Sequence, residues 1–273
     1  TRVLASPDLV KVEAAAPRQG ARARAMSPRE MLRLCPRLAA IAELVPAGLA
    51  LADIGTDHAL LPSALVLAGR VPRALACDRA QGPLACARLT VARHGLGERV
   101  HLRLGEGLAA VRPGEVATVV IAGMGPDTLL AVLAADLEQV RGLTRLVLQP
   151  NFGAEAVRRW LAAHALALVD ERLVEDRGRF YTVLAATPDG DDLRERESWD
   201  AASWALGPFV LRRPDATLRR YLADELRRCE RAAAGLGRSV APDPEQVRAL
   251  AERRALLAGA LANAGALTHP GPA

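Results

Sequence analysis

The chain has 273 residues, of which 51% are hydrophobic and 25% are charged. A chain of this length can bury a full core, which predicts a soluble globular protein with one main domain and an appendage. No apolar run approaches the roughly 20 residues of a membrane-spanning helix, and no apolar segment precedes a cleavage site near the N-terminus. These absences argue against a membrane protein and favour the cytoplasm. The four cysteines form no C-x-x-C pair, so we expect reduced thiols and no metal site.

The formal charge of +5 is unevenly distributed along the chain. Residues 1–33 carry a net charge of +4, residues 34–190 are neutral, and residues 191–273 carry +1. Within the last segment, residues 212–238 hold eight arginines against four acids. Arginine forks match phosphate oxygens and their binding releases counterions, so this segment indicates a polyanionic partner. A helix surface laced with salt bridges is the alternative.

In chain order, residues 1–26 lack hydrophobic periodicity and predict a disordered tail. Residues 34–45 place apolar side chains on one helical face, which predicts an amphipathic helix beside a sheet. The stretch LALADIGTDHALLPS at 49–63 then predicts a buried parallel strand ending at Asp53, Ile54 and Gly55. Ligands of open α/β sheets bind at this carboxyl edge, so Asp53 is expected to face a ligand as an acceptor.

The same strand-then-helix rhythm repeats after this first strand. The strand predicted at 74–78 ends in Asp78, 23 residues after Gly55, and the strand at 100–104 is followed by Glu106. The first spacing matches the acceptor that holds ribose hydroxyls in nucleoside-binding α/β units. Further strands are predicted at 118–122 and 145–148. Five strands alternating with helices predict a parallel, doubly wound α/β sheet.

Two later apolar runs, 166–174 and 179–186, are separated by a short turn that contains glycine. They predict an antiparallel hairpin that closes the sheet. The whole pattern has acids after strands one to three and a hairpin at the end of the sheet. This pattern resembles that of a Rossmann-like class I methyltransferase, which uses S-adenosyl-L-methionine. A dehydrogenase is not favoured, because G-x-G-x-x-G is absent.

More specific motifs occur in order along residues 34–262. They are Asp53 to Ala59 with Leu61-Pro62, Gln81-Gly82-Pro83, Ala122 to Gly125, Leu148 to Asn151, Gly178 to Tyr181 and Leu206 to Phe209. Together they resemble the bacterial tRNA (adenine-22-N1)-methyltransferases. One departure is Pro126, where the family usually has glycine, because proline donates no backbone N–H and a contact relying on that amide is lost.

The resemblance implies a cofactor site and a tRNA substrate, with no metal. The residues that it assigns to S-adenosyl-L-methionine are Asp53, Ile54, Gly55, His58, Asp78, Glu106, Gly107, Gly123 and Met124. Catalysis should be mainly alignment, because N1 of adenine needs no strong base before attack. Asp57 and Asn151 are the candidates for stabilising charge that develops on the base. Each is also a residue type that caps its own turn.

The tail predicts a helical hairpin, in which one stripe of apolar residues ends before 235–244 and a second follows. Arginine pairs on its outer face are expected to contact tRNA backbone. These are Arg212, Arg213, Arg219, Arg220, Arg227 and Arg228. The expected domains are a methyltransferase domain at 27–190 and a coiled-coil-like helical domain at 191–273, in a monomer or weak homodimer.

Two other functions are also compatible with the sequence. The first alternative is an RNA-binding protein on a methyltransferase scaffold, with catalysis weakened or lost at Pro126. The second is a small-molecule methyltransferase whose helical tail serves only for oligomerisation.

Overall fold

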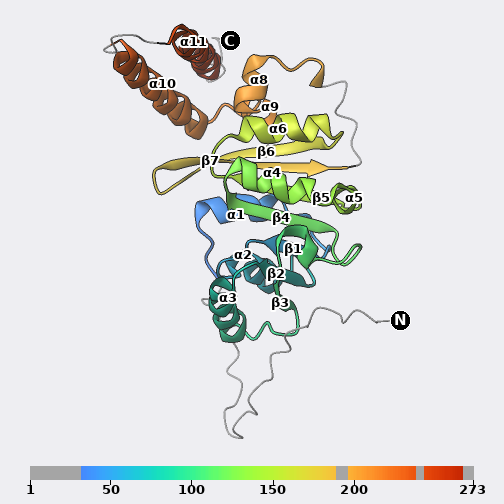
Figure 1. The fold of residues 1–273 in the computed structure, drawn as a ribbon. Coiled ribbons are helices and arrows are strands. Elements are labelled where there is room, and N and C mark those ends of the chain that lie inside the picture. The colour runs from blue at the N-terminus through green and yellow to red at the C-terminus, as the bar shows by residue number, and fades with distance from the viewer. Residues whose placement is uncertain (1–31, 189–195, 238–242, 267–273) are drawn as a thin grey trace, which may run out of the picture. The chain divides into compact units, whose positions relative to one another are not determined.

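The computed structural model describes residues 32–188, 196–237 and 243–266 (Figure 1). The tail expected at 1–26 lies outside these residues. By its internal contacts the chain divides into a first unit, Thr1–Gly123 with Asp127–Leu148, and a second unit, Met124–Pro126 with Gln149–Ala273. Among the described helices, none combines the length and apolar character needed to cross a membrane.

Strands and helices alternate through the first part of the chain. The strands are β1 (Leu51–Ile54), β2 (Ala74–Asp78), β3 (Val100–Leu104), β4 (Thr118–Met124) and β5 (Arg145–Pro150). The helices are α1 (Pro36–Leu44), α2 (Leu60–Leu67), α3 (Gln81–Arg93), the 3-10 helix η2 (Gly107–Ala110), α4 (Pro126–Ala134) and α5 (Leu137–Arg141). Each predicted strand is therefore present, and β4 and β5 each run two residues further than expected.

The sheet has the strand order β3-β2-β1-β4-β5-β7-β6. Strand β1 pairs in parallel with β2 on one side and β4 on the other, and β2 pairs in parallel with β3. All four residues of β1 are buried, as expected for a central strand covered on both faces. The predicted Rossmann-like sheet, parallel strands closed by a hairpin, is thereby confirmed.

The second unit contains the hairpin, the helix before it and the helices after it. These elements are α6 (Ala154–Ala163), β6 (Ala167–Asp176), β7 (Arg179–Thr187), α8 (Ala201–Leu206), α9 (Pro208–Leu211), α10 (Ala216–Leu236) and α11 (Pro244–Ala266). Strands β6 and β7 are antiparallel and joined by Arg177 and Gly178 alone, because Asp176 already pairs with Arg179. Both loop residues have positive φ, +52° and +74°, as the tight hairpin turns that match strand twist require.

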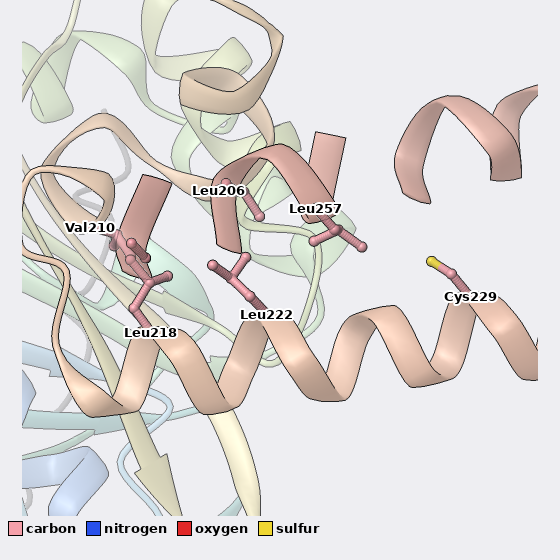
Figure 2. Packing of buried hydrophobic residues seen from close by; sticks show 8 residues of the cluster. Leu206, Val210, Leu218, Leu222, Cys229 and Leu257 are labelled. Atoms are coloured by element: carbon pink, nitrogen blue, oxygen red, sulfur yellow. The ribbon is translucent and has the colours of Figure 1, made fainter. Parts of the chain in front are cut away.

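Helices α10 and α11 pack against each other through the two apolar stripes that the sequence predicts. Figure 2 shows side chains of α10 pointing toward α8, α9 and α11, with Leu218, Leu222 and Cys229 on α10 and Leu257 on α11. Burying these side chains supplies the main apolar contribution that holds the helices together. The predicted helical hairpin is formed by the described residues.

A buried ion pair connects this helical region to the hairpin within the second unit. Arg158 on α6 donates from Nε to Oε1 of Glu171 on β6 at 2.7 Å, and both side chains are at most 1% exposed. The other guanidinium nitrogens of Arg158 donate to the last three carbonyls of α8, those of Trp204, Ala205 and Leu206, at 3.0 to 3.3 Å. One arginine thus caps the C-terminus of α8 and neutralises a buried carboxylate.

Gly207 lies directly against this pair and adopts φ +105°, a conformation that strains any other residue. A Cβ at this position would stand 2.5 Å from Oε2 of Glu171 and 2.6 Å from Nη2 of Arg158. Both groups are packed and cannot retreat into solvent. The glycine of the Leu206-Gly207-Pro208-Phe209 motif is therefore explained by the structure, because the backbone passes too close to the ion pair to leave room for a side chain.

Replacing Gly207 by alanine is expected to destabilise the protein by about 2 to 4 kcal/mol, from backbone strain and displacement of the ion pair. Urea unfolding of the full chain measures this. Gly259→Ala is the matched control, because a Cβ there meets nothing within 4 Å. In the interior of α11 that change should stabilise by about 0.5 to 1 kcal/mol. Equal responses of the two variants would contradict this account of Gly207.

Candidate functional site

The three acids singled out from the sequence lie along one edge of the first unit. Strands β1, β2 and β3 are parallel neighbours, so their carboxyl ends meet at the same edge. Asp53 is the third residue of β1, Asp78 ends β2, and Glu106 follows β3 by two residues. The register pairs Asp53 with Ala76 and Asp78 with Leu104. The predicted juxtaposition of the three acids at one sheet edge is observed.

Asp53 is the most deeply buried of these acids. Its carboxyl group is buried, with the residue 8% exposed, and it accepts a hydrogen bond from Oγ1 of Thr56 at 2.6 Å. Burial raises the pKa of Asp53 from 3.8 to about 6, with a further rise from the charge of Asp78 and opposing effects of Thr56 and Arg37. A buried carboxylate with a raised pKa is poised to accept from a cationic group.

Asp53 lines a cavity of about 280 Å³ in the first unit. Two of its lining glycines, Gly55 and Gly123, have φ of +78° and +77°, so the chain turns sharply at both places. The amides of Gly55 and Thr56 both donate to the carbonyl of Cys77, at 2.8 and 2.9 Å, which fixes the turn after β1. The cavity is thus bounded by rigid backbone that leaves room for a ligand.

The start of α2 forms another part of the cavity wall. Ala59, at φ +50°, precedes the helix without a side-chain cap, and Leu60 and Leu61 of its first turn line the cavity. The first amides of a helix have no partner within the helix. This wall is therefore suited to an anionic group.

Arg37 on α1 is a cavity residue that nothing in the sequence pattern singles out. It lines the cavity together with Asp53, and its charge lowers the pKa of that acid. Its Nη1 lies 3.5 Å from the point where a Cβ on Gly123 would stand. One buried carboxyl group and one guanidinium thus share the cavity, and these are an acceptor suited to an ammonium group and a donor suited to a carboxylate.

Further along the edge, Oδ1 of Asp78 accepts from the amide of Ala80 at 2.8 Å. Glu106 is exposed and pairs loosely with Arg79 at 3.8 Å. Leu104, in register with Asp78, is 47% exposed, which offers an apolar face beside that acid. The side chain of Ile54, another candidate, is buried, so only its backbone is available to a ligand. Gly107 has φ +53°, a left-handed conformation that favours glycine.

The turn after β1 carries Asp57 and His58, which both line the cavity. Nε2 of His58 lies 3.1 Å from Oδ2 of Asp57, and both side chains are at least half exposed. Within the described ranges, no group of three or more His, Cys, Asp or Glu side chains could hold a metal ion. The Asp57–His58 pair offers hydrogen-bonding groups at the cavity rim.

The second unit contains the other two loops that the sequence singled out. The amide of Asn151 donates to the carbonyl of Met124 at 2.8 Å, which joins the ends of β4 and β5. Pro126 is buried at the first position of α4, where proline is favoured. Its ring lies 3.2 Å from the point where a Cβ on Gly153 would stand, and Gly153 has φ +66°. Pro126 is thus accommodated by the fold, and its only chemical loss is one amide donor.

The arginines expected on the outer face of the tail are largely engaged with acids. Arg213 contacts Asp170 at 2.8 Å and Arg220 contacts Glu175 at 2.8 Å. Arg227 and Arg228 both contact Asp224, at 3.3 and 3.1 Å. Of the remaining two, Arg219 is half-buried, and Arg212 lies over the ring of Phe209 at 5.2 Å.

The first two of these pairs link the tail to β6 within the second unit. The domain boundary expected at residue 190 stays a prediction. Exposed ion pairs contribute only about 0 to 1 kcal/mol, so phosphate groups can compete for these arginines.

Comparison with known proteins identifies the family of this chain. A family model described as a methyltransferase domain matches residues 34–184. The tRNA (adenine(22)-N(1))-methyltransferase of Bacillus subtilis is 34% identical over 230 residues, which cover 83% of this chain and 96% of that protein. The chain belongs to this methyltransferase family.

Solved structures of the family have the same fold. The B. subtilis enzyme TrmK superposes with a TM-score of 0.75 at 33% identity, covering 84% of this chain and 99% of that structure. A Streptococcus pneumoniae protein crystallised with S-adenosyl-L-methionine superposes with a TM-score of 0.73 at 30% identity, covering 82% and 98%. The family assignment thus extends over both units of the described chain.

Proposed function

We propose that this protein is an S-adenosyl-L-methionine-dependent enzyme that methylates N1 of adenine 22 in tRNA. The observation that carries the proposal is the cavity in which a buried carboxyl group, Asp53, and a guanidinium, Arg37, lie beside two sharply turned glycines. The similarity to the B. subtilis tRNA (adenine(22)-N(1))-methyltransferase names the reaction and the substrate. We also propose that the protein acts in the cytoplasm, where tRNA is present as a substrate.

The residues of the first unit suit the amino-acid, ribose and adenine parts of the cofactor in turn. Asp53 would accept from the ammonium group, while Arg37 and the first amides of α2 would bind the carboxylate. Asp78, with one oxygen already held by Ala80, has acceptor capacity for the ribose hydroxyls. Leu104 and the backbone at Gly107 would contact the adenine ring, and Glu106 would accept from its amino group.

The bound cofactor supplies a methyl group on a sulfonium, which is already electrophilic. The protein therefore needs no strong base, since N1 of adenine carries a free lone pair at neutral pH. Its task is to align the acceptor and to exclude water, which can lower a barrier by several kcal/mol. Asp57 and Asn151 are proposed to stabilise the positive charge that the base acquires, through a carboxylate and an amide oxygen respectively.

Incubation with the cofactor and unmodified tRNA, followed by mapping of N1-methyladenosine, tests the proposal. We expect product at position 22. Asp78→Asn should weaken cofactor binding about tenfold or more, because a charge-assisted hydrogen bond becomes a neutral one. Calorimetric titration with S-adenosyl-L-methionine measures that change. Binding of cofactor and tRNA without any methylated product would instead favour an RNA-binding protein whose catalysis was lost at Pro126.

A further inference from the structure

A second cavity, of about 560 Å³, lies entirely within the second unit, and its lining includes Asn151 but none of the residues assigned to the cofactor. Its walls come from the loop after β5, the start of β7, and helices α10 and α11. A smaller cavity of about 170 Å³ shares most of these lining residues. A volume of this order is in the range of sites for small ligands and nucleotides.

The wall of this cavity carries exposed and half-buried aromatic rings. Phe152 is 68% exposed, although a phenylalanine is normally buried. Phe180 and Tyr221 pack edge to face with their ring centroids 5.5 Å apart, so both rings are held in place. A chain with only 3% aromatic residues thus places four of them around one cavity, which are Phe152, Phe180, Tyr181 and Tyr221. Rings presented in this way are suited to stacking on a nucleobase.

The charged residues of the lining are three arginines and one glutamate, so the cavity is cationic. Glu225 accepts from Nη2 of Arg253 at 2.7 Å and lies 3.4 Å from Nη1 of Arg228. Arg228 also contacts Asp224 at 3.1 Å, which leaves its charge largely balanced. Arg179 differs from both, because it is exposed and has no side-chain hydrogen bond or ion pair with any residue that the structure describes.

We propose that this cavity binds an unpaired nucleotide of the RNA substrate, with the base stacked on Phe152 and a backbone phosphate on Arg179. The proposal rests on the proposed function, since it takes tRNA as the substrate. An aromatic face beside an unneutralised guanidinium is the combination that single-stranded RNA requires. Arg179 would also provide a phosphate contact that is not already engaged with an acid, unlike most of the arginines of the tail.

The test uses the full chain, with substrate tRNA binding measured by fluorescence anisotropy. Phe152→Leu keeps an apolar side chain but removes the π face, and it should weaken binding roughly 5- to 100-fold. Phe152→Tyr should bind like the wild type. Because Phe152 is exposed, neither change is expected to unfold the protein, and calorimetric titration with the cofactor checks that the first unit is intact.

The phosphate contact is tested through the salt dependence of binding. Arg179→Ala should reduce the slope of log K against log salt concentration by about 1. Arg88→Ala is the matched control, because Arg88 is an exposed arginine on α3 outside the cavity. We expect its slope to equal that of the wild type.

Wild-type binding by Phe152→Leu, or an unchanged slope for Arg179→Ala, would overturn this assignment. Such results leave the proposed reaction standing if the wild type still methylates tRNA. Conversely, a wild type that binds tRNA through these residues but yields no N1-methyladenosine would refute the proposed reaction alone. The two proposals can thus fail separately.

Discussion

Replacing Asp53 by asparagine is expected to stabilise the ligand-free protein at neutral pH and, at the same time, to abolish tight cofactor binding. The fold holds this carboxylate in a buried position that raises its pKa from 3.8 to about 6, a shift that corresponds to about 3 kcal/mol of lost stability when the group is ionised. Asparagine retains an oxygen that can accept from Thr56 but carries no charge to bury. We therefore expect the free energy of unfolding to rise by about 1 to 3 kcal/mol.

The same replacement is expected to weaken cofactor binding, although it stabilises the ligand-free protein. An ammonium group gains a charge-assisted hydrogen bond from a carboxylate and only a neutral one from an amide, so affinity should fall roughly 10- to 100-fold. Urea unfolding at pH 7.5 measures the first effect, and calorimetric titration with S-adenosyl-L-methionine measures the second. Glu98→Gln, at an exposed acid of the same unit, should change neither quantity. A less stable Asp53→Asn protein would contradict the role assigned to burial.

The pH dependence gives an independent check on the same group. Its pKa is higher in the folded state than in the unfolded state, so the folded protein binds more protons between pH 4 and 6. The contribution of Asp53 to stability is therefore most favourable below about pH 4, declines as pH rises toward 6, and is constant above that. The stability difference between Asp53→Asn and the wild type should shrink when the pH is lowered from 7 to 4. Cofactor affinity of the wild type should fall below about pH 6, because a protonated carboxyl group carries no charge.

The chain order of strands and acids could be predicted because it follows from local patterns. A buried strand that ends on Asp53 or Asp78 shows its period and its terminus in the sequence itself, and parallel pairing then brings the two acids to one edge. The hairpin was predicted for the same reason, although the turn is tighter than expected, with only Arg177 and Gly178 outside the strands.

Residues whose role depends on distant partners could not be found in this way. Arg37 lies on a helix with ordinary amphipathic periodicity, and only the folded chain brings it into the cavity of Asp53. Likewise, the charge of the tail left open whether its arginines are available to phosphate or paired with acids, because the sequence does not show that Asp170 and Glu175 of β6 lie within 2.8 Å of Arg213 and Arg220. Long-range pairing of charges is set by tertiary structure, which local patterns do not encode.

Arg158 is the extreme case of this kind, and its replacement by methionine is expected to destabilise the protein by about 3 to 5 kcal/mol. The guanidinium is buried, it neutralises Glu171, and it is the donor for three carbonyls at the end of α8. Methionine fills a similar volume but leaves a buried carboxylate without its cation. Urea unfolding of the full chain measures the loss.

A double replacement separates the stranded charge from the lost helix cap. Adding Glu171→Met to Arg158→Met removes the uncompensated carboxylate, so the double variant should be more stable than the single one. It should stay below the wild type, because the carbonyls of α8 still lack a donor. Arg159→Met, at an exposed position on the same helix, is the control and should cost no more than about 1 kcal/mol. If the double variant were as unstable as the single one, the cost would lie in the cap of α8, and the ion pair itself would contribute little to holding the helices of the second unit on the hairpin.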